Sequence, residues 1–211
     1  MELSSAGSVG TRIITTGNIH AEAVTLFSVL LASDDAGKTW AESFERIRGA
    51  GLDRIDPLDA SIVWISGQEL FPIPQNPFLL ASSDGGKTWE RKAVLNEAAE
   101  DRFGSVQQFH FTDKNDGSLI VDRAAGNGGD AAFILYETRD GGESWQLKQE
   151  SAKPLHIRQP PPSTEWRVRA ESASRAYHIE RRQGEKWIGV AAFSVNLDRC
   201  VPPPADAGGG R

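Results

Sequence analysis

Three aspartates in this chain stand in the same local setting, and carboxylates that recur in this way could act as metal ligands or as acid and base groups. Each follows a Ser or Thr two positions earlier. Each also precedes Gly at the second position, Thr or Ser at the fourth and Trp at the fifth. The copies read SDDAGKTW at 33–40, SSDGGKTW at 82–89 and TRDGGESW at 138–145. We therefore ask whether these carboxylates carry out chemistry or hold a turn.

The distance between the copies favours a turn. Their tryptophans lie 49 and 56 positions apart, a period typical of solenoids and propellers, and carboxylates in separate repeat units would not meet. Within one copy, Asp can accept backbone hydrogen bonds, Gly can take positive φ, and Trp can bury its ring against a sheet. We interpret the recurring positions as structural: Ser33, Asp35, Gly37, Thr39, Trp40, Ser82, Asp84, Gly86, Thr88, Trp89, Thr138, Asp140, Gly142, Ser144 and Trp145.

No other set of residues predicts catalysis. Glycoside hydrolysis needs two carboxylates about 5 to 9.5 Å apart across a cleft, and no pair among the remaining Asp and Glu residues stands out by spacing. Tyr136 and Tyr177 lie in strand-like segments, and the four histidines lack metal-ligand spacing. The chain has no nucleophile elbow, phosphate loop or dinucleotide fingerprint. We therefore expect no catalytic residue, no cofactor and no metal ion.

Composition narrows the range of partners. Hydrophobic residues make up 39% and charged residues 25% of the chain, as in globular proteins. The formal charge of −6 argues against a nucleic-acid partner, which requires a clustered positive face. No apolar run approaches the roughly 18 residues that span a bilayer, so we expect no membrane insertion. Cys200 is the single cysteine, and residues 1–12 lack the pattern of a signal peptide.

The segments around the three octapeptides predict β-hairpins. Short apolar runs lead into them at 25–33, 77–83 and 131–139, and nearly alternating polar and apolar residues follow each Trp. Further strand-like segments lie upstream, so that each unit supplies about four strands. The stretch ERRQGEKW at 180–187 could be a fourth, eroded copy, because only its Gly and Trp survive.

Four-stranded antiparallel sheets at this period predict an all-β fold, a β-propeller of about four to five blades. We expect one domain over 1–198 and a Pro- and Gly-rich C-terminal tail over 199–211. A closed ring is our expectation, and the alternative is an open piece that dimerises through its unpaired edge strands. The predicted blades cover, approximately, residues 11–50, 58–98, 105–152 and 163–197.

The repeated pattern resembles the Asp box, or bacterial neuraminidase repeat. This box occurs in sialidase-type propellers, sortilin-like receptors, xyloglucanases and photosystem II assembly or stability factors. The stretches DGGKTW and DGGESW, with FTDKNDGSLIV at 111–121, look most like the photosystem II assembly factor branch. The resemblance implies that the boxes lie on the blade periphery and that the protein is extracytoplasmic, periplasmic or secreted. A cytoplasmic location stays open, since the chain shows no signal peptide.

The resemblance to sialidases does not extend to their chemistry. In that family an Arg precedes the Ile-Pro pair, and this chain has Pro72 at that position of FPIP, 71–74. Proline cannot bind a substrate carboxylate as Arg does. We therefore expect a noncatalytic propeller that acts as a protein-interaction or assembly module. The alternative is a carbohydrate-binding or glycoside-hydrolase protein of the sialidase-like kind, with a glycan ligand.

One loop stands out as a candidate binding surface. Residues 67–77 place Leu70, Phe71 and Ile73 among prolines, whose stiffness lowers the cost of ordering on binding. The loop could equally fold over the core. A second, weaker candidate is the stretch 126–133, GNGGDAAF. The identity of the protein partner and the oligomeric state stay open.

Overall fold

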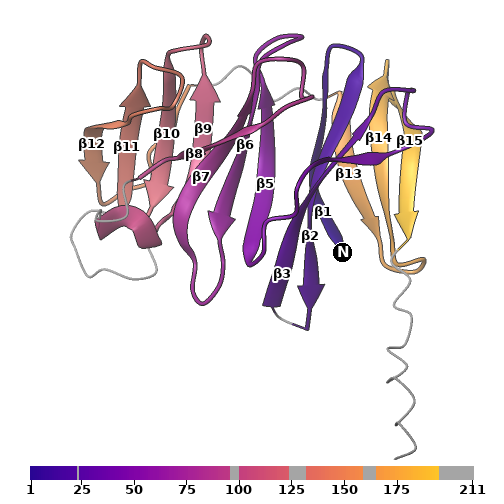
Figure 1. Cartoon of the computed structure of the whole chain (residues 1–211), viewed down its shortest axis with the longest axis horizontal. Helices are drawn as coiled ribbons and strands as arrows, with labels where there is room; N and C mark the ends of the chain where they lie inside the picture. Colours follow the sequence, from indigo (N-terminus) through magenta and orange to yellow (C-terminus); the bar gives the residue numbers. More distant parts are fainter. Residues whose placement is uncertain (23, 96–99, 124–131, 159–164, 195–211) are drawn as a thin grey trace, which may run out of the picture.

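The computed structural model describes residues 1–22, 24–95, 100–123, 132–158 and 165–194 (Figure 1). Within these ranges one 3-10 turn, η1 (Glu100–Phe103), accompanies four antiparallel sheets. The first sheet holds β1 (Glu2–Val9), β2 (Arg12–Ala21), β3 (Val24–Ser33) and β4 (Ala41–Phe44). The second holds β5 (Ala50–Pro57), β6 (Val63–Glu69), β7 (Gln75–Ser82) and β8 (Glu90–Ala93). The third holds β9 (Ser105–Phe111), β10 (Gly117–Asp122), β11 (Phe133–Thr138) and β12 (Gln146–Ser151), and the fourth holds β13 (Trp166–Glu171), β14 (Ala176–Gln183) and β15 (Lys186–Ser194).

Each sheet is a meander whose strands pair in chain order, as blades of a propeller do. The all-β, blade-type fold predicted from the sequence is confirmed. The strand count departs from the prediction in one place, because the described part of the fourth sheet has three strands rather than four.

The first two sheets begin earlier than the predicted blades. They start at Glu2 and Ala50, whereas we expected the blades to start near residues 11 and 58. The sequences of β1 and β5, ELSSAGSV and AGLDRIDP, contain small, acidic, Gly and Pro residues that are poor strand formers. These strands form because β2 and β6 pair with them. The division into a domain over 1–198 and a tail stays a prediction, since 195–211 lie outside the described residues.

Apolar side chains fill the layers between neighbouring sheets. One core joins the first and second sheets and includes Ile14, Leu30 and Phe78. Another joins the second and third sheets, where the rings of Trp64 and Phe111 stack with centroids 3.7 Å apart. The second sheet is covered on both faces, which explains why β6 and β7 begin with or contain continuous apolar runs rather than an alternation. Each fully buried large side chain contributes about 1.5–3 kcal/mol.

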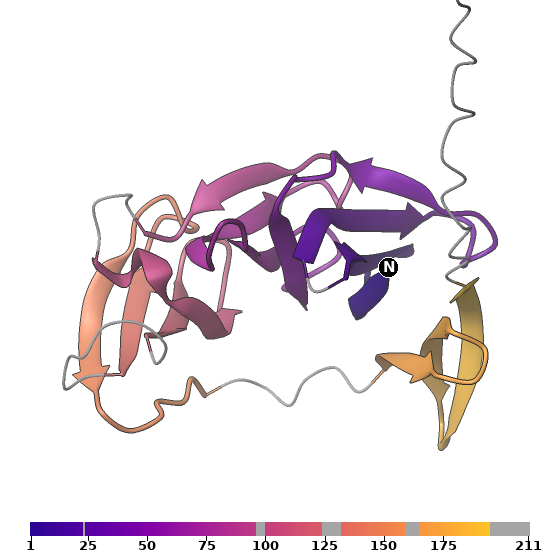
Figure 2. The same ribbon diagram turned by 90° about the horizontal axis from the view of Figure 1, so that it is seen from below.

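The four sheets form an open arc in the order third, second, first and fourth (Figure 2). The strand β5 packs against β1, β2 and β3, β9 packs against β6 and β7, and β13 packs against β1. The third and fourth sheets therefore lie at opposite ends of the arc. The closed ring that we expected is not formed.

The two sheets at the ends of the arc, the fourth and the third, make polar side-chain contacts on the sides that face no other sheet. On the fourth sheet, Trp166 faces the first sheet, where its Nε1 donates to Ser8 Oγ at 3.2 Å. Because side chains alternate along a strand, Arg167 and its cross-strand partner Glu180 face the other way. Arg167 and Arg169 both donate to Glu180, at 2.6 and 3.0 Å. This face therefore presents a charged, hydrogen-bonded row, in which the Arg167 guanidinium also lies 4.2 Å from the centroid of the Trp187 ring.

The third sheet is covered at its free side by the chain that leaves it. The Gln108 side chain hydrogen-bonds both backbone groups of Ile157: its Nε2 donates to the carbonyl oxygen at 3.3 Å and its Oε1 accepts from the N–H at 2.9 Å. This contact holds the segment after β12 against β9.

Candidate functional site

The first of the three repeated turns, between β3 and β4, uses its aspartate entirely within the turn. Asp35 Oδ1 accepts from Ser33 Oγ at 2.8 Å and from the N–H groups of Lys38 and Thr39 at 3.0 and 2.9 Å. Asp35 Oδ2 accepts from Thr39 Oγ1 at 2.6 Å. The Gly37 N–H donates to Ser33 Oγ at 2.9 Å, with Gly37 at φ 88°. The turn is therefore closed by contacts within eight residues.

The other two turns repeat this network. Asp84 Oδ1 accepts from the Thr88 N–H at 2.9 Å, and Asp140 Oδ1 accepts from the Ser144 N–H at 2.9 Å. In each turn the hydroxyl of the same residue also donates to Oδ2, at 2.7 and 2.5 Å. The two aspartates lie between β7 and β8 and between β11 and β12.

These hydrogen bonds stabilise the charged form of each carboxyl group. Donation by the Thr39 hydroxyl, followed by the Thr39 N–H, lowers the pKa of Asp35 to about 2. Donation by the Ser144 hydroxyl likewise lowers the pKa of Asp140 to about 2. The Thr88 N–H holds the pKa of Asp84 well below its ordinary value. A carboxylate in this state is a poor general acid near neutral pH.

The three turns lie on separate sheets and do not bring their carboxylates together. All three turns lie on the same side of the arc, which is the upper side in Figure 1. There the Gly85 N–H donates to Ser61 O at 2.8 Å and the Gly141 N–H donates to Asn115 O at 2.8 Å, which ties two of them to the β5–β6 and β9–β10 turns. Across the described residues, no group of three or more His, Cys, Asp or Glu could hold a metal ion.

The tryptophans that end the turns differ in their partners. Trp40 Nε1 donates to Gly37 O within its own turn at 3.0 Å. Trp89 Nε1 donates to Ser43 Oγ of the neighbouring sheet at 3.2 Å. Trp145 Nε1 is buried and has no acceptor in the described part of the chain. The position that corresponds to Ser43, three residues after the preceding Trp, is Lys92, and an ammonium group cannot accept a hydrogen bond.

The opposite side of the arc, the lower side in Figure 1, carries exposed apolar side chains. Two of the three loop residues predicted from the sequence lie there in solvent, Phe71 at 65% and Ile73 at 51% exposure. Three further exposed large apolar residues lie at this side: Val24 and Leu26 at the start of β3, and Phe103 at the end of η1, just before β9. We call these five residues the apolar rim.

Backbone hydrogen bonds place parts of the rim side by side. The Gly49 N–H donates to Leu26 O at 2.8 Å. Gly49 O in turn accepts from the N–H groups of Leu70 and Phe71, at 2.7 and 3.1 Å. Gly49, just before the second sheet, therefore joins the start of β3 in the first sheet to the β6–β7 loop. Both segments lie on the lower side of the arc in Figure 1.

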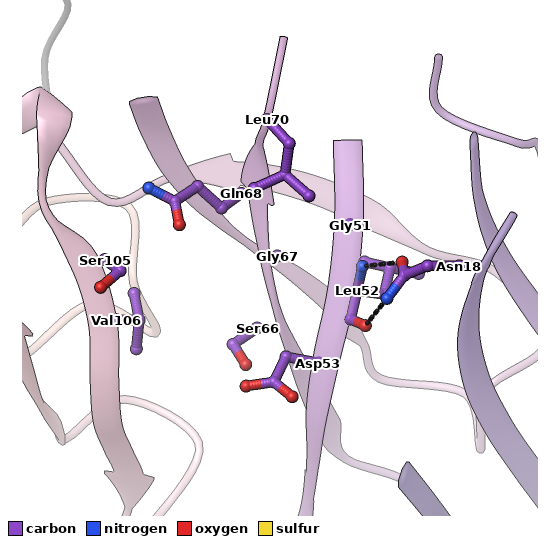
Figure 3. Close-up of a pocket in the computed structure, with 10 residues that line it drawn as sticks. All are labelled: Asn18, Gly51, Leu52, Asp53, Ser66, Gly67, Gln68, Leu70, Ser105 and Val106. Carbon is purple, nitrogen blue, oxygen red and sulfur yellow. Dashed lines mark hydrogen bonds between the residues drawn. The ribbon is translucent and has the colours of Figure 1, made fainter. Parts of the chain in front are cut away.

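A pocket of about 340 Å³ lies next to the rim, and Leu70, the third predicted loop residue, is half-buried at its edge (Figure 3). We call it the Asp53 pocket. Asp53 and Ser66 stand on one wall, and the amide of Gln68 is held by Gly104 O, to which its Nε2 donates at 2.8 Å. The pocket is lined by Asn18, Gly51, Leu52, Asp53, Ser66, Gly67, Gln68, Leu70, Ser105 and Val106.

The sequence did not distinguish this pocket. Asp53 stood among many loop carboxylates, and Asn18, Gln68 and Ser105 carried no signal. These residues come from three different sheets, and only the packing of neighbouring blades brings them together. Asn18 shows how: its Nδ2 donates to Leu52 O at 3.2 Å and its Oδ1 accepts from the Leu52 N–H at 2.9 Å, which joins β2 to β5.

A row of three groups on the first sheet has the composition of a catalytic triad. His20 lies between Thr25 and Glu2, with Nδ1 3.1 Å from Thr25 Oγ1 and Nε2 3.1 Å from Glu2 Oε2. The His20 and Glu2 side chains are 32% and 56% exposed. Triad chemistry depends on a site that excludes water and presents oxyanion donors. This exposed row offers neither, and we assign it no chemistry.

Two further acidic residues, Asp56 and Glu69, belong to the strands that line the Asp53 pocket, β5 and β6, and each is paired with a neighbouring side chain. His110 Nδ1 lies 3.1 Å from Asp56 Oδ2, which links β9 to β5. Glu69 accepts from Arg91 at 2.7 Å and from Asn76 at 2.8 Å. Each of these two acids therefore has a side-chain hydrogen-bond partner. In the described ranges no helix is long and apolar enough to span a membrane.

Comparison with solved structures finds several that are similar to this chain, three of which are described here. The structure "YCF48 bound to D1 peptide" matches 89% of this chain and 54% of its own, with 17% identity and a TM-score of 0.50. The GH74 xyloglucanase from Xanthomonas campestris matches 65% of this chain and 18% of its own, with 16% identity and a TM-score of 0.46. YCF48 from Cyanidioschyzon merolae matches 69% and 40%, with 15% identity and a TM-score of 0.42.

At these identities the likeness shows the β-propeller fold and nothing finer. The chain spans about half of the YCF48 chain in the peptide complex. No protein-family model matches the chain, and no curated protein matches it.

Proposed function

We propose that this chain is a noncatalytic β-propeller module that binds a protein partner through the apolar rim. The observation that carries the proposal is that five large apolar side chains, in the β6–β7 loop, at the start of β3 and at the end of η1, are exposed on the lower side of the arc in Figure 1. Removing apolar surface from water gains about 25 cal/mol per Å². Contiguous exposed apolar surface on a soluble domain commonly marks a binding site.

The scaffold supports this role. Loops on a rigid framework are the usual carriers of binding function, and the rim loops are anchored by backbone hydrogen bonds to Gly49. The structurally similar YCF48 is described as bound to a D1 peptide. We carry over from this likeness only the class of ligand, a segment of another protein.

Two finer assignments belong to the same proposal. The three aspartate turns have the residue pattern of Asp boxes, and we assign them that role of closing peripheral hairpins. By the same resemblance we propose an extracytoplasmic setting, which fractionation of cells that express the full-length gene product would test. Recovery of the protein with the cytosolic fraction would contradict the second assignment.

A site-specific photo-crosslinking experiment tests the proposed function. A photoreactive phenylalanine analogue at position 71 should capture a protein partner in the native cell extract, and the pair Phe71→Ser with Ile73→Ser should abolish capture by a probe at position 26. The matched controls are Leu147 and Ile188, which are 55% and 46% exposed on the third and fourth sheets. Equal capture from position 147 would contradict the proposal.

The alternative function is carbohydrate binding, which one feature favours: the exposed ring of Phe71 follows Leu70, which lines a pocket that also holds polar side chains, and such an aromatic ring can stack on a sugar face. A glycan array with the wild type and Phe71→Ser separates the two readings. Specific glycan binding that is lost with Phe71→Ser, together with an empty crosslinking result, would move the protein to the carbohydrate class.

A further inference from the structure

The Asp53 carboxylate is exposed and makes no hydrogen bond or ion pair with any described residue, although charged groups near it are paired. Figure 3 shows the side chain pointing into the pocket between β5 and β9. A carboxylate at a concave site without a cation is an attractive position for a positively charged ligand group. The neighbouring pairs, Asp56 with His110 and Glu69 with Arg91, leave Asp53 as the free negative charge of the described pocket wall.

The backbone around Asp53 is built to hold this side chain. The pairing of β5 with β6 shifts between Leu52 and Ile55, so that Asp53 and Arg54 form an irregularity in the strand. Bulges of this kind redirect side chains and are common beside functional sites. Side chains satisfy the displaced backbone groups: Thr16 Oγ1 donates to Asp53 O at 3.0 Å, and the Arg54 N–H donates to Ser66 Oγ at 3.1 Å.

The size of the pocket limits what can enter. A volume of about 340 Å³ is near the lower end of the roughly 300–1,000 Å³ typical of ligand sites. It therefore suits one long side chain better than a bulky ligand. The walls offer apolar contact from Leu70 and Val106 and polar contact from Asp53, Ser66 and Ser105.

A Lys or Arg side chain fits this division, because it has an apolar stem and a charged head. With Nε2 of Gln68 engaged by Gly104 O, the Oε1 of Gln68 can accept from the head group alongside Asp53. Arg has the additional advantage of a planar fork of donors that matches a carboxylate.

We propose that the Asp53 pocket binds a single basic side chain of the partner, with Asp53 as the counter-charge, while the apolar rim contacts the neighbouring apolar residues of the same segment. This inference rests on the proposed function, since it names the chemistry of the segment that the rim receives. The partner segment is then a Lys or Arg flanked by large apolar side chains.

The test uses a defined probe, the capped tripeptide N-acetyl-Leu-Arg-Leu-amide, titrated into the full chain and followed by backbone amide NMR. We expect chemical-shift changes at Leu52–Arg54, at Ser66–Gln68 and at Ser105–Val106. The same tripeptide with citrulline in place of Arg keeps the shape and removes the charge. It should bind about fivefold or more weakly, as expected for a partly screened ion pair.

Asp53→Asn should reduce the affinity for the Arg peptide by about fivefold and leave the citrulline peptide unchanged. Glu185→Gln, on an exposed hairpin of the fourth sheet, is the matched control and should change neither. Since the Asp53 side chain bonds to no described residue, the Asn variant should keep the wild-type melting temperature. Equal affinity for the two peptides, or an Arg affinity that Asp53→Asn does not alter, would overturn the inference.

Failure of this inference is distinguishable from failure of the proposed function. If Phe71→Ser with Ile73→Ser abolishes partner crosslinking while Asp53→Asn does not weaken Arg binding, the rim stands and the basic-residue pocket is rejected. If Asp53→Asn weakens binding of the Arg peptide while Phe71→Ser with Ile73→Ser leaves partner crosslinking unchanged, the basic-residue pocket is supported and the rim is rejected as the docking surface.

Discussion

At the scale of single residues, the three turn aspartates show how a carboxylate can be conspicuous without being a catalyst. Asp35, Asp84 and Asp140 direct both oxygens to donors within their own turns. Their low pKa values result from these donors, so they report local structure rather than a reacting partner. Asp53 has the opposite character, since no described residue satisfies it and it lines a pocket.

Replacing Asp84 by Ala should destabilise the protein at pH 7 by about 1–3 kcal/mol, because several donors of the turn lose their acceptor. The pKa of Asp84 is lower when folded than when unfolded. Its contribution is therefore present above pH ~4 and is lost as the pH falls through the lower folded value. Urea unfolding of both proteins should show the difference shrinking steadily below pH ~4.

Asp34→Ala is the control for this experiment. Asp34 stands beside Asp35 but makes a surface ion pair with Arg12 at 3.0 Å, with its side chain 68% exposed. Removing it should cost no more than about 1 kcal/mol. A difference between wild type and Asp84→Ala that stays constant down to pH ~2 would contradict the assigned role of the carboxylate.

At the scale of elements, each hairpin depends on its neighbour through the terminal Trp. Ser43 in β4 accepts from Trp89 Nε1 and donates to Gly86 O at 2.8 Å, which joins the first sheet to the second turn. The junction between β8 and the third turn lacks this contact, because Lys92 pairs with Glu143 and Glu90 instead. The repeated units are thus alike in their turns and unequal in how they are joined.

Lys92→Ser should be more stable than Lys92→Ala by about 1 kcal/mol, because only the hydroxyl can accept from the buried Trp145 Nε1. Both variants lose the Lys92 side chain, which is 12% exposed, together with its ion pairs, so the comparison isolates the hydroxyl. The reciprocal change, Ser43→Ala, should cost about 1–2 kcal/mol by leaving Trp89 Nε1 without its acceptor. Chemical denaturation of the three variants measures these effects, and equal stability of Lys92→Ser and Lys92→Ala would show that the hydroxyl does not reach the indole.

At the scale of the whole molecule, the junctions between neighbouring sheets differ in how many apolar side chains they bury. The junctions of the second sheet are filled by buried aliphatic and aromatic side chains. The junction of the fourth sheet with the first includes the edge-to-face pair of Trp40 and Phe193, with centroids 5.4 Å apart, and the Trp166–Ser8 hydrogen bond, but no residue of β13, β14 or β15 belongs to either buried cluster. We therefore expect the fourth sheet to open separately from the rest.

Phe193→Ala should raise amide hydrogen exchange in β13, β14 and β15 by roughly tenfold or more while β6, β7 and β10 keep their protection. Ile188→Ala, in the same strand but with its side chain 46% exposed, is the control and should leave exchange unchanged. A uniform loss of protection across all four sheets would mean that the arc unfolds as one cooperative unit.

The hairpins could be predicted from the sequence because their determinants are local. Every contact that closes the first turn lies between Ser33 and Trp40, so the pattern of eight residues carries the structure. The apolar runs before each turn likewise predicted β3, β7 and β11. The first strands of the first two sheets, β1 and β5, were not predicted from the sequence, because their residues form strands only through pairing with β2 and β6.

By itself, the sequence determined the all-β blade fold and the position of the three turns, and it singled out the loop of Phe71 and Ile73 without deciding whether that loop is exposed. Only the tertiary structure decided that the arc is open, because closure depends on how the third and fourth sheets, at its two ends, are placed relative to each other. It alone also assembled the Asp53 pocket and the rest of the rim. Asn18, Asp53 and Ser105 are brought together by the packing of three sheets, and no spacing along the chain encodes that proximity.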